Sequence, residues 1–423
     1  MLMQEKIPIS RKQIILGSLI CLMGGLFYCY EFVLRIIPGA LQGELSEAFG
    51  NISAATFGQL AALYYFAYSP MQLPVGMLMD RFGPRRLLSF ACLCCTVGSL
   101  LFCYSNSLTV AGCGRFLIGF GSSFAFVGVL SLTVQWLPRR YFSLVTGLIT
   151  TLSMLGIVYG QIKITAMVGT MGLSHVLGMM VIIGALLTVC IFLIVHDGPR
   201  GTHTQALSFS SLFKNFARVL LSPQLWLIGF VGACLYTSLS VFGELWGKSY
   251  LEQAHHLTKM QAAQSISMVF IGWAIGAPLA GYWSDRTGRR VFPLVVGALF
   301  SLITISLVLY SRDLSFMSLN IILFVYGLFS GTEIIIFVMA KETMGVDSLS
   351  GTVFAAANMI VTLGGVVLQP LVGVLLDMFG RGNIVNGEHV YAIVDYQLAL
   401  SVLPISLLLV IVAGFFLKDK ARV

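Results

Sequence analysis

The sequence predicts an all-α membrane protein whose twelve transmembrane helices form two pseudo-symmetric six-helix bundles. Three observations lead to this prediction. First, 57% of the 423 residues are hydrophobic and only 10% are charged, whereas a soluble domain has about 25% charged residues. Second, the apolar runs are about twenty residues or longer and do not alternate, which favours helices over a barrel inside lipid. Third, one loop motif recurs half a chain apart.

Short polar loops separate the expected spans, apart from one longer polar segment between the sixth and the seventh. This segment divides the chain into an N-terminal bundle of residues 1–195, a central cytoplasmic loop of residues 196–222 and a C-terminal bundle of residues 223–423. The expected spans are residues 14–38, 53–79, 86–105, 108–137, 141–168, 174–195, 223–251, 261–283, 291–310, 316–340, 351–377 and 393–417.

The distribution of positive charge predicts the orientation in the membrane. Most of the 25 Lys and Arg residues fall in the two termini, the central loop and the loops on the same side, such as residues 81–86 and 286–290. Because positively charged loops stay in the cytoplasm, we expect both termini to be cytoplasmic. The same clustering explains the net charge of +8, and the sequence shows no basic stripe that would bind nucleic acid. We therefore expect the lipid bilayer, and no nucleic acid, as a partner.

Other function classes find little support. The nine cysteines all fall inside expected spans and indicate neither a disulfide framework nor a metal site. The sequence contains no nucleophile–base set, no Walker loop and no metal-ligand spacing. We therefore expect no enzyme activity, no metal, no cofactor and no direct use of ATP.

The most specific motif lies between the second and third spans and returns between the eighth and ninth. The two copies read Gly76-Met-Leu-Met-Asp80-Arg81-Phe-Gly83-Pro-Arg85-Arg86 and Gly281-Tyr-Trp-Ser-Asp285-Arg286-Thr-Gly288-Arg289-Arg290, and a weaker third copy from Gly373 to Arg381 ends the eleventh span. Duplication of a three-helix unit explains all three. Together with Arg115-Phe-Leu-Ile-Gly119-Phe-Gly121 in span four, these loops resemble the signatures of the major facilitator superfamily over the whole chain.

The two strong copies are interpreted as conformational switch loops. A carboxylate is stabilised at a helix N-terminus, so we expect Asp80 to face the start of span eleven, near Ser350 and Gly351, and Asp285 to face the start of span five, near Tyr141 and Ser143. Such contacts would join the two halves in the outward-open state and break when the cytoplasmic side opens. Gly76 and Gly281 are expected to allow close helix approach. The alternative is that these are only tight-turn and positive-inside residues. The full set is Gly76, Asp80, Arg81, Gly83, Arg85, Gly281, Asp285, Arg286, Gly288 and Arg289.

Ionisable residues at membrane depth are costly, and they are candidates for function. The resemblance implies that spans one, four, seven and ten line the central cavity, and all but one of these residues fall on those four spans. They are Glu31, Arg35, Arg115, Glu244, Lys248 and Glu333, with Lys163 on span five as the exception.

Two pairs among these residues share one helix face because they are four residues apart. Glu31 and Arg35 form either a self-satisfied pair or a site in which Arg35 binds a substrate carboxylate while Glu31 carries a proton or binds a substrate ammonium group. Glu244 and Lys248 repeat the spacing on span seven, although Lys248 is close enough to the outer end to snorkel.

The remaining polar candidates each have two interpretations. The resemblance implies proton coupling for Arg115, and the alternative is a structural partner of Glu31. Glu333 is either a gate or second carboxylate, or a packed, paired or protonated residue, and Lys163 either reaches the cavity or snorkels. Asn358 is the best placed amide. Several aromatic residues either line the cavity or pack against helices and lipid, namely Tyr28, Tyr30, Tyr64, Tyr65, Tyr68, Tyr236, Trp246, Trp273 and Tyr326.

The sequence predicts a secondary active transporter that takes up a small polar or zwitterionic organic nutrient by proton-coupled alternating access. None of the six histidines lies deep in a span, so carboxylates would carry the protons. The run Tyr30-Glu31-Phe32-Val33-Leu34-Arg35, followed by Pro38, looks like the bacterial phagosomal amino-acid transporters and, more distantly, the lysosomal dipeptide transporters. This resemblance implies an amino acid or a small peptide as cargo and a bacterial inner membrane as the location.

Alternatives remain open at this stage. The protein is otherwise an exporter or importer of another organic solute, such as a drug, a nucleoside or a carboxylate siderophore, or else a non-transporting sensor or scaffold. The segment from Gly147 to Gly160 lacks proline, which departs from the superfamily's drug–proton antiporters and argues against drug export. We expect a monomer.

Overall fold

The computed structural model describes residues 11–138, 141–198, 217, 219–311, 313–344, 350–380, 384–385, 388–389 and 391–419. The elements before the central loop are α1 (Arg11–Ala40), α2 (Gln42–Ala48), α3 (Ala54–Phe82), α4 (Pro84–Tyr104), α5 (Leu108–Ser122), α6 (Ala125–Trp136), α7 (Phe142–Met171) and α8 (Leu173–Ile194). Those after it are α10 (Pro223–Thr237), η2 (Ser238–Trp246), α11 (Gly247–Ala254), α12 (Lys259–Thr287), α13 (Val291–Tyr310), α14 (Phe316–Ser330), η3 (Gly331–Ile334), α15 (Ile335–Met344), α16 (Ser350–Phe379), β1 (Ile384–Val385), β2 (Glu388–His389), α17 (Ile393–Leu400) and α18 (Val402–Ala413).

The number of membrane-crossing segments agrees with the sequence. Within the described residues, eleven helical segments are long and apolar enough to cross a bilayer. The twelfth is α3, which has 29 residues but a more polar composition. Its polar residues include Tyr64 and Tyr65, which are buried inside the protein and therefore do not contact lipid. The prediction of a twelve-helix, all-α membrane fold is confirmed.

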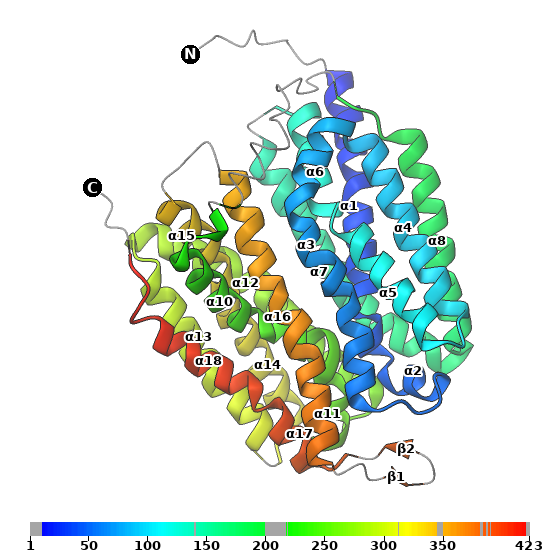
Figure 1. Ribbon diagram of the computed structural model, residues 1–423, viewed down its shortest axis with the longest axis vertical. Coiled ribbons are helices and arrows are strands. Elements are labelled where there is room, and N and C mark those ends of the chain that lie inside the picture. The colour runs from blue at the N-terminus through cyan, green and yellow to red at the C-terminus, as the bar shows by residue number, and fades with distance from the viewer. Residues whose placement is uncertain are drawn as a thin grey trace.

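The two halves of the chain lie on either side of a central seam (Figure 1). Across the seam α16 packs along α3, α12 packs along α7, and η2 packs against α1. α1 begins and α18 ends at the same end of the molecule, which we call the terminal end (Figure 1). The opposite end, called the far end, carries α2, α11, α17 and the short β1–β2 hairpin.

In the part of the chain that the structure describes, four of the expected spans are interrupted rather than continuous, and span twelve breaks at Ser401, between α17 and α18. Span four breaks at Ser123 and Phe124, between α5 and α6. Span seven contains the π-helix η2, and span ten contains the 3₁₀ turn η3. Irregular turns inside long helices are common at functional sites. Glu244 lies in η2 and Glu333 in η3, so two of the membrane-depth carboxylates are on irregular turns.

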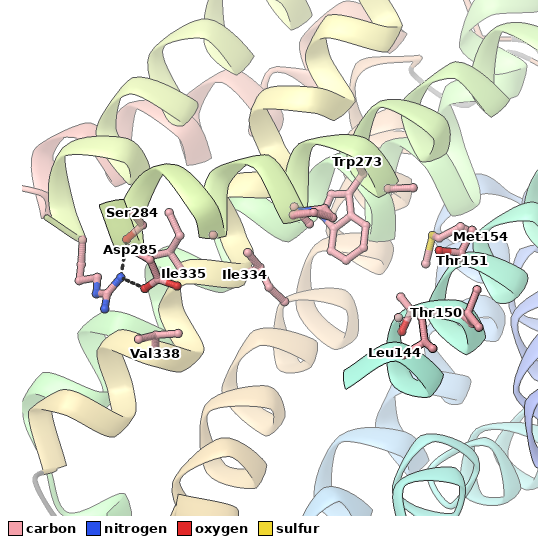
Figure 2. A pocket seen from close by; sticks show the side chains of 17 residues that line it. Leu144, Thr150, Thr151, Met154, Trp273, Ser284, Asp285, Ile334, Ile335 and Val338 are labelled. Carbon is pink, nitrogen blue, oxygen red and sulfur yellow. Dashed lines mark hydrogen bonds and ion pairs between the residues drawn. The ribbon is translucent and has the colours of Figure 1, made fainter. Parts of the chain in front are cut away.

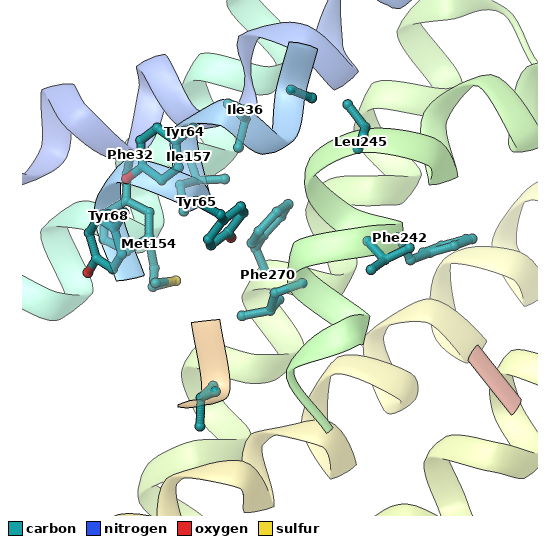
Figure 3. Close-up of a cluster of buried hydrophobic side chains, with 14 of the residues drawn as sticks. Phe32, Ile36, Tyr64, Tyr65, Tyr68, Met154, Ile157, Phe242, Leu245 and Phe270 are labelled. Carbon is teal, nitrogen blue, oxygen red and sulfur yellow. The ribbon is translucent and has the colours of Figure 1, made fainter. Parts of the chain in front are cut away.

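The packing separates a lipid-facing surface from an interior with aromatic and polar residues. Large apolar side chains such as Phe66 and Leu186 are exposed on the outside of the helices, as expected where lipid replaces water. Along the seam, rings from the two halves approach one another, with Tyr64, Tyr65 and Phe32 on one side and Phe242 and Phe270 on the other (Figure 3). The seam therefore places polar tyrosines among apolar side chains.

Candidate substrate and coupling site

Arg35 is the centre of a buried polar cluster at the seam. Its side chain leaves α1 one turn after Glu31, and its Nη2 donates to both carboxylate oxygens of Glu31 at 3.2 Å. Glu31 is 0% exposed and Arg35 is 4% exposed. The i,i+4 spacing thus places the two charges in direct contact inside the protein.

The C-terminal half contributes a second carboxylate. Arg35 Nη1 lies 3.9 Å from Oε1 of Glu244 and donates to the Tyr236 hydroxyl at 3.2 Å. Tyr65, on α3 in the other half, donates to Oε2 of Glu244 at 2.5 Å. Arg35 therefore lies between two carboxylates that come from opposite halves, and its contact with Glu31 is the closer one.

Aromatic rings surround the Arg35 guanidinium. Its Cζ lies 4.2 Å from the ring centroid of Phe32, 5.0 Å from that of Tyr64 and 5.1 Å from that of Tyr68. The Tyr64 hydroxyl accepts from Arg35 Nε at 2.9 Å and donates to Glu31 Oε2 at 2.9 Å. A desolvated cation–π contact contributes about 2 kcal/mol, so the rings offset part of the cost of burying the guanidinium.

From the sequence, these tyrosines either line the cavity or pack against helices and lipid. The structure shows that the hydroxyls of Tyr64, Tyr65 and Tyr236 bond to the buried charges. The available signal was the i,i+4 spacing of Tyr64 and Tyr68 on the helix that faces span one. Spacing alone does not show which neighbouring helix supplies the charges.

Arg115 lies behind this cluster and holds main-chain groups. From α5 its Nη1 donates to the Leu34 carbonyl at 3.0 Å and its Nη2 donates to the Ala61 carbonyl at 3.4 Å. In the described part of the chain Arg115 forms no hydrogen bond or ion pair with Glu31 and instead ties α1 to α3. Arg115 is 2% exposed, and its charge brings the formal sum of Arg35, Arg115, Glu31 and Glu244 to zero.

Lys248 and Glu333 lie outside the Arg35 cluster. Lys248 donates to the Ala40 carbonyl and lies 3.5 Å from Glu252, so it joins the halves nearer the far end. Glu333 is 3% exposed, and the described part of the chain gives it no hydrogen bond or ion pair through its side chain. The expected grouping of all six charges is thus reduced to four.

Of the other residues predicted to line the cavity, some lie beside the Arg35 cluster and others lie elsewhere. Tyr28 lies two turns before Arg35 on α1, with its ring centroid 4.8 Å from that of Phe32, so it belongs to the cluster's face. Tyr30 instead donates to the Met180 carbonyl at 2.9 Å, inside the N-terminal half. Asn358 donates to Gln72 Oε1 at 3.0 Å across the seam, and Lys163 is exposed beside the Tyr159 ring.

Main-chain contacts and ion pairs close the seam at the far end. Gly39 packs against the main chain of Glu244, where any side chain would collide. Ser249 donates to Gln42 at 2.7 Å, and Lys259 lies 2.6 Å from Glu44. Burial is the largest influence on the Glu44 carboxyl and raises its pKa, but the hydrogen bond from Lys259, a main-chain hydrogen bond and the charges of Lys259 and Lys248 together lower the pKa below its usual value.

At the terminal end the halves instead enclose a cavity of about 610 Å³. Leu144, Thr151 and Met154 of α7 face Trp273 and Ile335 of the other half across it (Figure 2). Met154 also belongs to the aromatic cluster at the seam (Figure 3). Met154 is thus shared by the cavity and the seam cluster, whereas Arg35, Glu31 and Glu244 are not among the described residues that line the cavity.

The second motif copy lies at the rim of this cavity. Arg290 ion-pairs with Asp285 at 2.7 Å and with Glu342 at 2.7 Å, and Asp285 lies across the cavity from Leu144. Arg286 donates to the Tyr282 hydroxyl at 3.4 Å. The hydrogen bonds that Arg290 donates to Glu342 and Asp285 raise the pKa of Arg290, against the effect of burial.

The glycines of both copies have distinct roles. Gly83 and Gly288 have φ of +78° and +65°, which favours glycine and ends α3 and α12. A Cβ on Gly76 or Gly281 would meet no atom of the described residues within 4 Å, so these residues do not show the expected close approach at the two positions. The halves are apart at the terminal end, which explains the difference. The side chains of Asp80, Ser143 and Ser350 lie outside the described residues.

The comparison with known proteins identifies the family. A sequence model of the Major Facilitator Superfamily matches residues 18–369. The chain belongs to this superfamily. The lysosomal dipeptide transporter MFSD1 of Danio rerio is 25% identical over 394 residues, covering 85% of this chain and 80% of that protein. The probable sulfoacetate transporter SauU of Cupriavidus necator is 24% identical over 302 residues, covering 67% of each.

The fold is also that of solved superfamily structures. The nucleoside transporter NupG superposes with a TM-score of 0.74 at 14% identity, covering 94% of this chain and 99% of that one. The match to the family model makes the chain a multi-pass integral membrane transporter of small molecules, and its relatives are transporters rather than enzymes.

Proposed function

We propose that this transporter takes up a small zwitterionic nutrient, an amino acid or a small peptide, by proton-coupled alternating access. The observation that carries the proposal is the position of Arg35 between Glu31 and Glu244, two carboxylates from opposite halves. A guanidinium offers paired donors that match a carboxylate, and carboxylates bind an ammonium group. A site with both signs and no net formal charge suits a cargo with the same property.

Binding and coupling share one arginine. A substrate carboxylate that approaches Arg35 competes with Glu31, whose oxygens accept from Nη2 at 3.2 Å. A fully buried carboxylate that loses its cationic partner is costly as an anion, so Glu31 takes up a proton as it is displaced. Protonation and substrate binding at Arg35 then occur together, which is the requirement for symport.

The conformation indicates which end of the protein is open. The halves touch at the far end through Lys248 and Ala40 and through Lys259 and Glu44, while a cavity of about 610 Å³ lies at the terminal end. The positive-inside pattern makes the terminal end cytoplasmic, so this is an inward-facing arrangement of two bundles, residues 1–195 and 223–423, in a bacterial inner membrane. A cavity of this size is within the usual range for small-molecule sites.

A relative supports the cargo class. MFSD1 of Danio rerio is named a dipeptide transporter, and a dipeptide is a zwitterion with a terminal carboxylate and ammonium. Arg35 and the two glutamates supply a partner for each end. This correspondence favours amino acids and peptides over neutral nucleosides.

A second candidate rests on the cavity wall. Its side chains are mainly apolar, among them Leu144, Leu148, Met154 and Trp273. Such a wall suits an organic solute with an apolar part, such as a drug or a hydrophobic carboxylate. The Arg35 cluster favours zwitterions, so we place this candidate second.

The deciding experiment is a thermal-shift screen of the purified protein, followed by uptake into proteoliposomes. The panel holds amino acids, dipeptides, nucleosides, citrate-like siderophores and cationic drugs. We expect amino acids or dipeptides to raise the melting temperature and to accumulate with an inward proton gradient. Stabilisation by drugs or nucleosides alone, or accumulation that ignores the gradient, would refute the proposal.

A further inference from the structure

The third motif copy has a carboxylate that reaches across the seam. Asp377, near the end of α16, accepts from the main-chain nitrogen of Ala54 at 3.1 Å through Oδ1 and from that of Ala55 at 3.0 Å through Oδ2. These are the first two residues of α3, in the other half. Tyr391 donates to Asp377 Oδ1 at 2.5 Å and accepts from the nitrogen of Ala54 at 2.9 Å.

The N-terminus of α3 is capped partly by its own half and partly by the other. Ser53 accepts locally from the nitrogen of Thr56 at 3.4 Å. The nitrogens of Ala54 and Ala55, which have no partner inside the helix, bond to Asp377 instead. A negative charge at a helix N-terminus also interacts favourably with the helix dipole. Separation of the halves at the far end would remove both effects.

Asp197 and Asp419 also cap helices, but without crossing the seam. Asp197 accepts from the nitrogen of Arg85 at 3.1 Å, at the start of α4. Asp419 accepts from the nitrogens of Arg290 and Val291 at 2.9 and 3.0 Å, at the start of α13. Each of these caps stays within one half and persists whichever end is open, whereas the Asp377 cap depends on the far end being closed.

Close main-chain packing brings Asp377 to α3. Gly373, one turn earlier, lies against the main chain of Ala54 and Ala55, where a side chain would collide. Gly58 packs in the same way against the main chain of Gln369 and Pro370. The Gly-x-x-x-Asp spacing of the third copy thus supplies a close approach and, one turn later, a carboxylate.

We propose that Asp377 is a positioning residue of the transport cycle, which holds the far end closed by capping α3 across the seam and lets go when the far end opens. The proposal rests on the transporter fold and on no particular cargo. The arrangement is the reciprocal of the one expected for Asp80. There, a carboxylate on span two faces the start of span eleven at the terminal end, and here a carboxylate on span eleven faces the start of span two at the far end.

The test measures the two ends of the protein separately by double electron–electron resonance. Spin labels replace Glu47 and Gln253, exposed residues of the two halves at the far end, or Leu148 and Val338, which face each other across the terminal cavity. Cys113, the exposed native cysteine, is changed to serine. Asp377→Asn removes the charge and preserves the shape, and Asp313→Asn is the matched control in an exposed loop at the same end.

We expect Asp377→Asn to lower the closed-to-open ratio at the far end about tenfold, which corresponds to about 1.4 kcal/mol, and to shorten the terminal-end distance at the same time. Asp313→Asn should match the wild type. Gly373→Ala keeps the carboxylate but forces α16 away from Ala54, so it should shift both distances in the same directions and serves if Asp377→Asn does not fold. Unchanged distances at both ends in either folded variant would overturn the proposal, and a far-end change without the reciprocal terminal-end change would reduce Asp377 to a local helix cap.

Discussion

Replacing Glu31 with glutamine tests whether the buried pair couples protons to transport. The substitution keeps the size of the side chain but removes the charge that Arg35 contacts at 3.2 Å and that Tyr64 contacts at 2.9 Å. Hydrogen bonds to a charged group contribute about 1.5–3 kcal/mol, and the glutamine amide retains one acceptor oxygen. We therefore expect the interaction of Arg35 with residue 31 to weaken by about 1.5–3 kcal/mol, or about 10- to 100-fold.

A weakened pair leaves Arg35 free for a substrate carboxylate without a protonation step. In proteoliposomes, Glu31→Gln should lose accumulation driven by a pH gradient and keep counterflow exchange of the same cargo. Its substrate affinity should no longer change between pH 5 and pH 8. Glu47→Gln, at an exposed position on α2, is the control and should behave as the wild type. Gradient-driven accumulation at the wild-type level in Glu31→Gln would refute this reasoning, and loss of both accumulation and exchange would leave Glu31 a structural partner of Arg35.

Three further predictions concern the seam. Tyr65→Phe removes the 2.5 Å hydrogen bond to Glu244 and should weaken cargo binding about tenfold or more, as measured by calorimetric titration; unchanged affinity would place Glu244 outside the binding site. Gly39→Ala puts a methyl group against the main chain of Glu244, so the far end should fail to close and uptake should fall at least tenfold. Normal uptake in this variant would contradict the close packing. The pKa of Glu44 is lowered in the folded protein, so its pairing with Lys259 stabilises the closed far end at any pH above the usual carboxyl pKa. This stabilisation is lost as the pH falls through the lowered pKa. Because Lys259 is 60% exposed, the loss of stabilisation should be at most about 1 kcal/mol. Spin-label distances should show it as a modest opening of the far end at low pH. Glu44→Gln should abolish this pH dependence.

The sequence predicted the membrane fold well because its signals are additive. The length of each apolar run, the paucity of charge and the doubled loop at Asp80 and Asp285 each act over a short stretch. The i,i+4 spacing also placed Glu31 beside Arg35, since helix geometry alone brings these side chains together. None of these steps required knowledge of which helices pack against one another.

Prediction of the site was less complete for a physical reason. Lys248 and Glu244 share a span and were assigned together, but the π-helix η2 changes the register of that span, and Lys248 instead contacts Ala40. Tyr65 and Glu244 come from different halves, so their hydrogen bond depends on how the halves are docked. No described atom lies within 4 Å of a Cβ on Gly76 or Gly281, because the halves are apart at that end.

The sequence by itself determined that this protein spans the membrane twelve times, that it belongs to a family of carriers built by duplication, and that charged residues of spans one and seven are candidates for its function. Hydrophobicity gave the spans, the resemblance of the repeated loop motif to known signatures gave the family, and each of these signals acts within a short segment. Only the tertiary structure decided that Arg35 lies between two carboxylates, that the far end is closed, and that Asp377 caps a helix of the other half. Those features depend on contacts between segments hundreds of residues apart, whose geometry is set by the docking of two bundles.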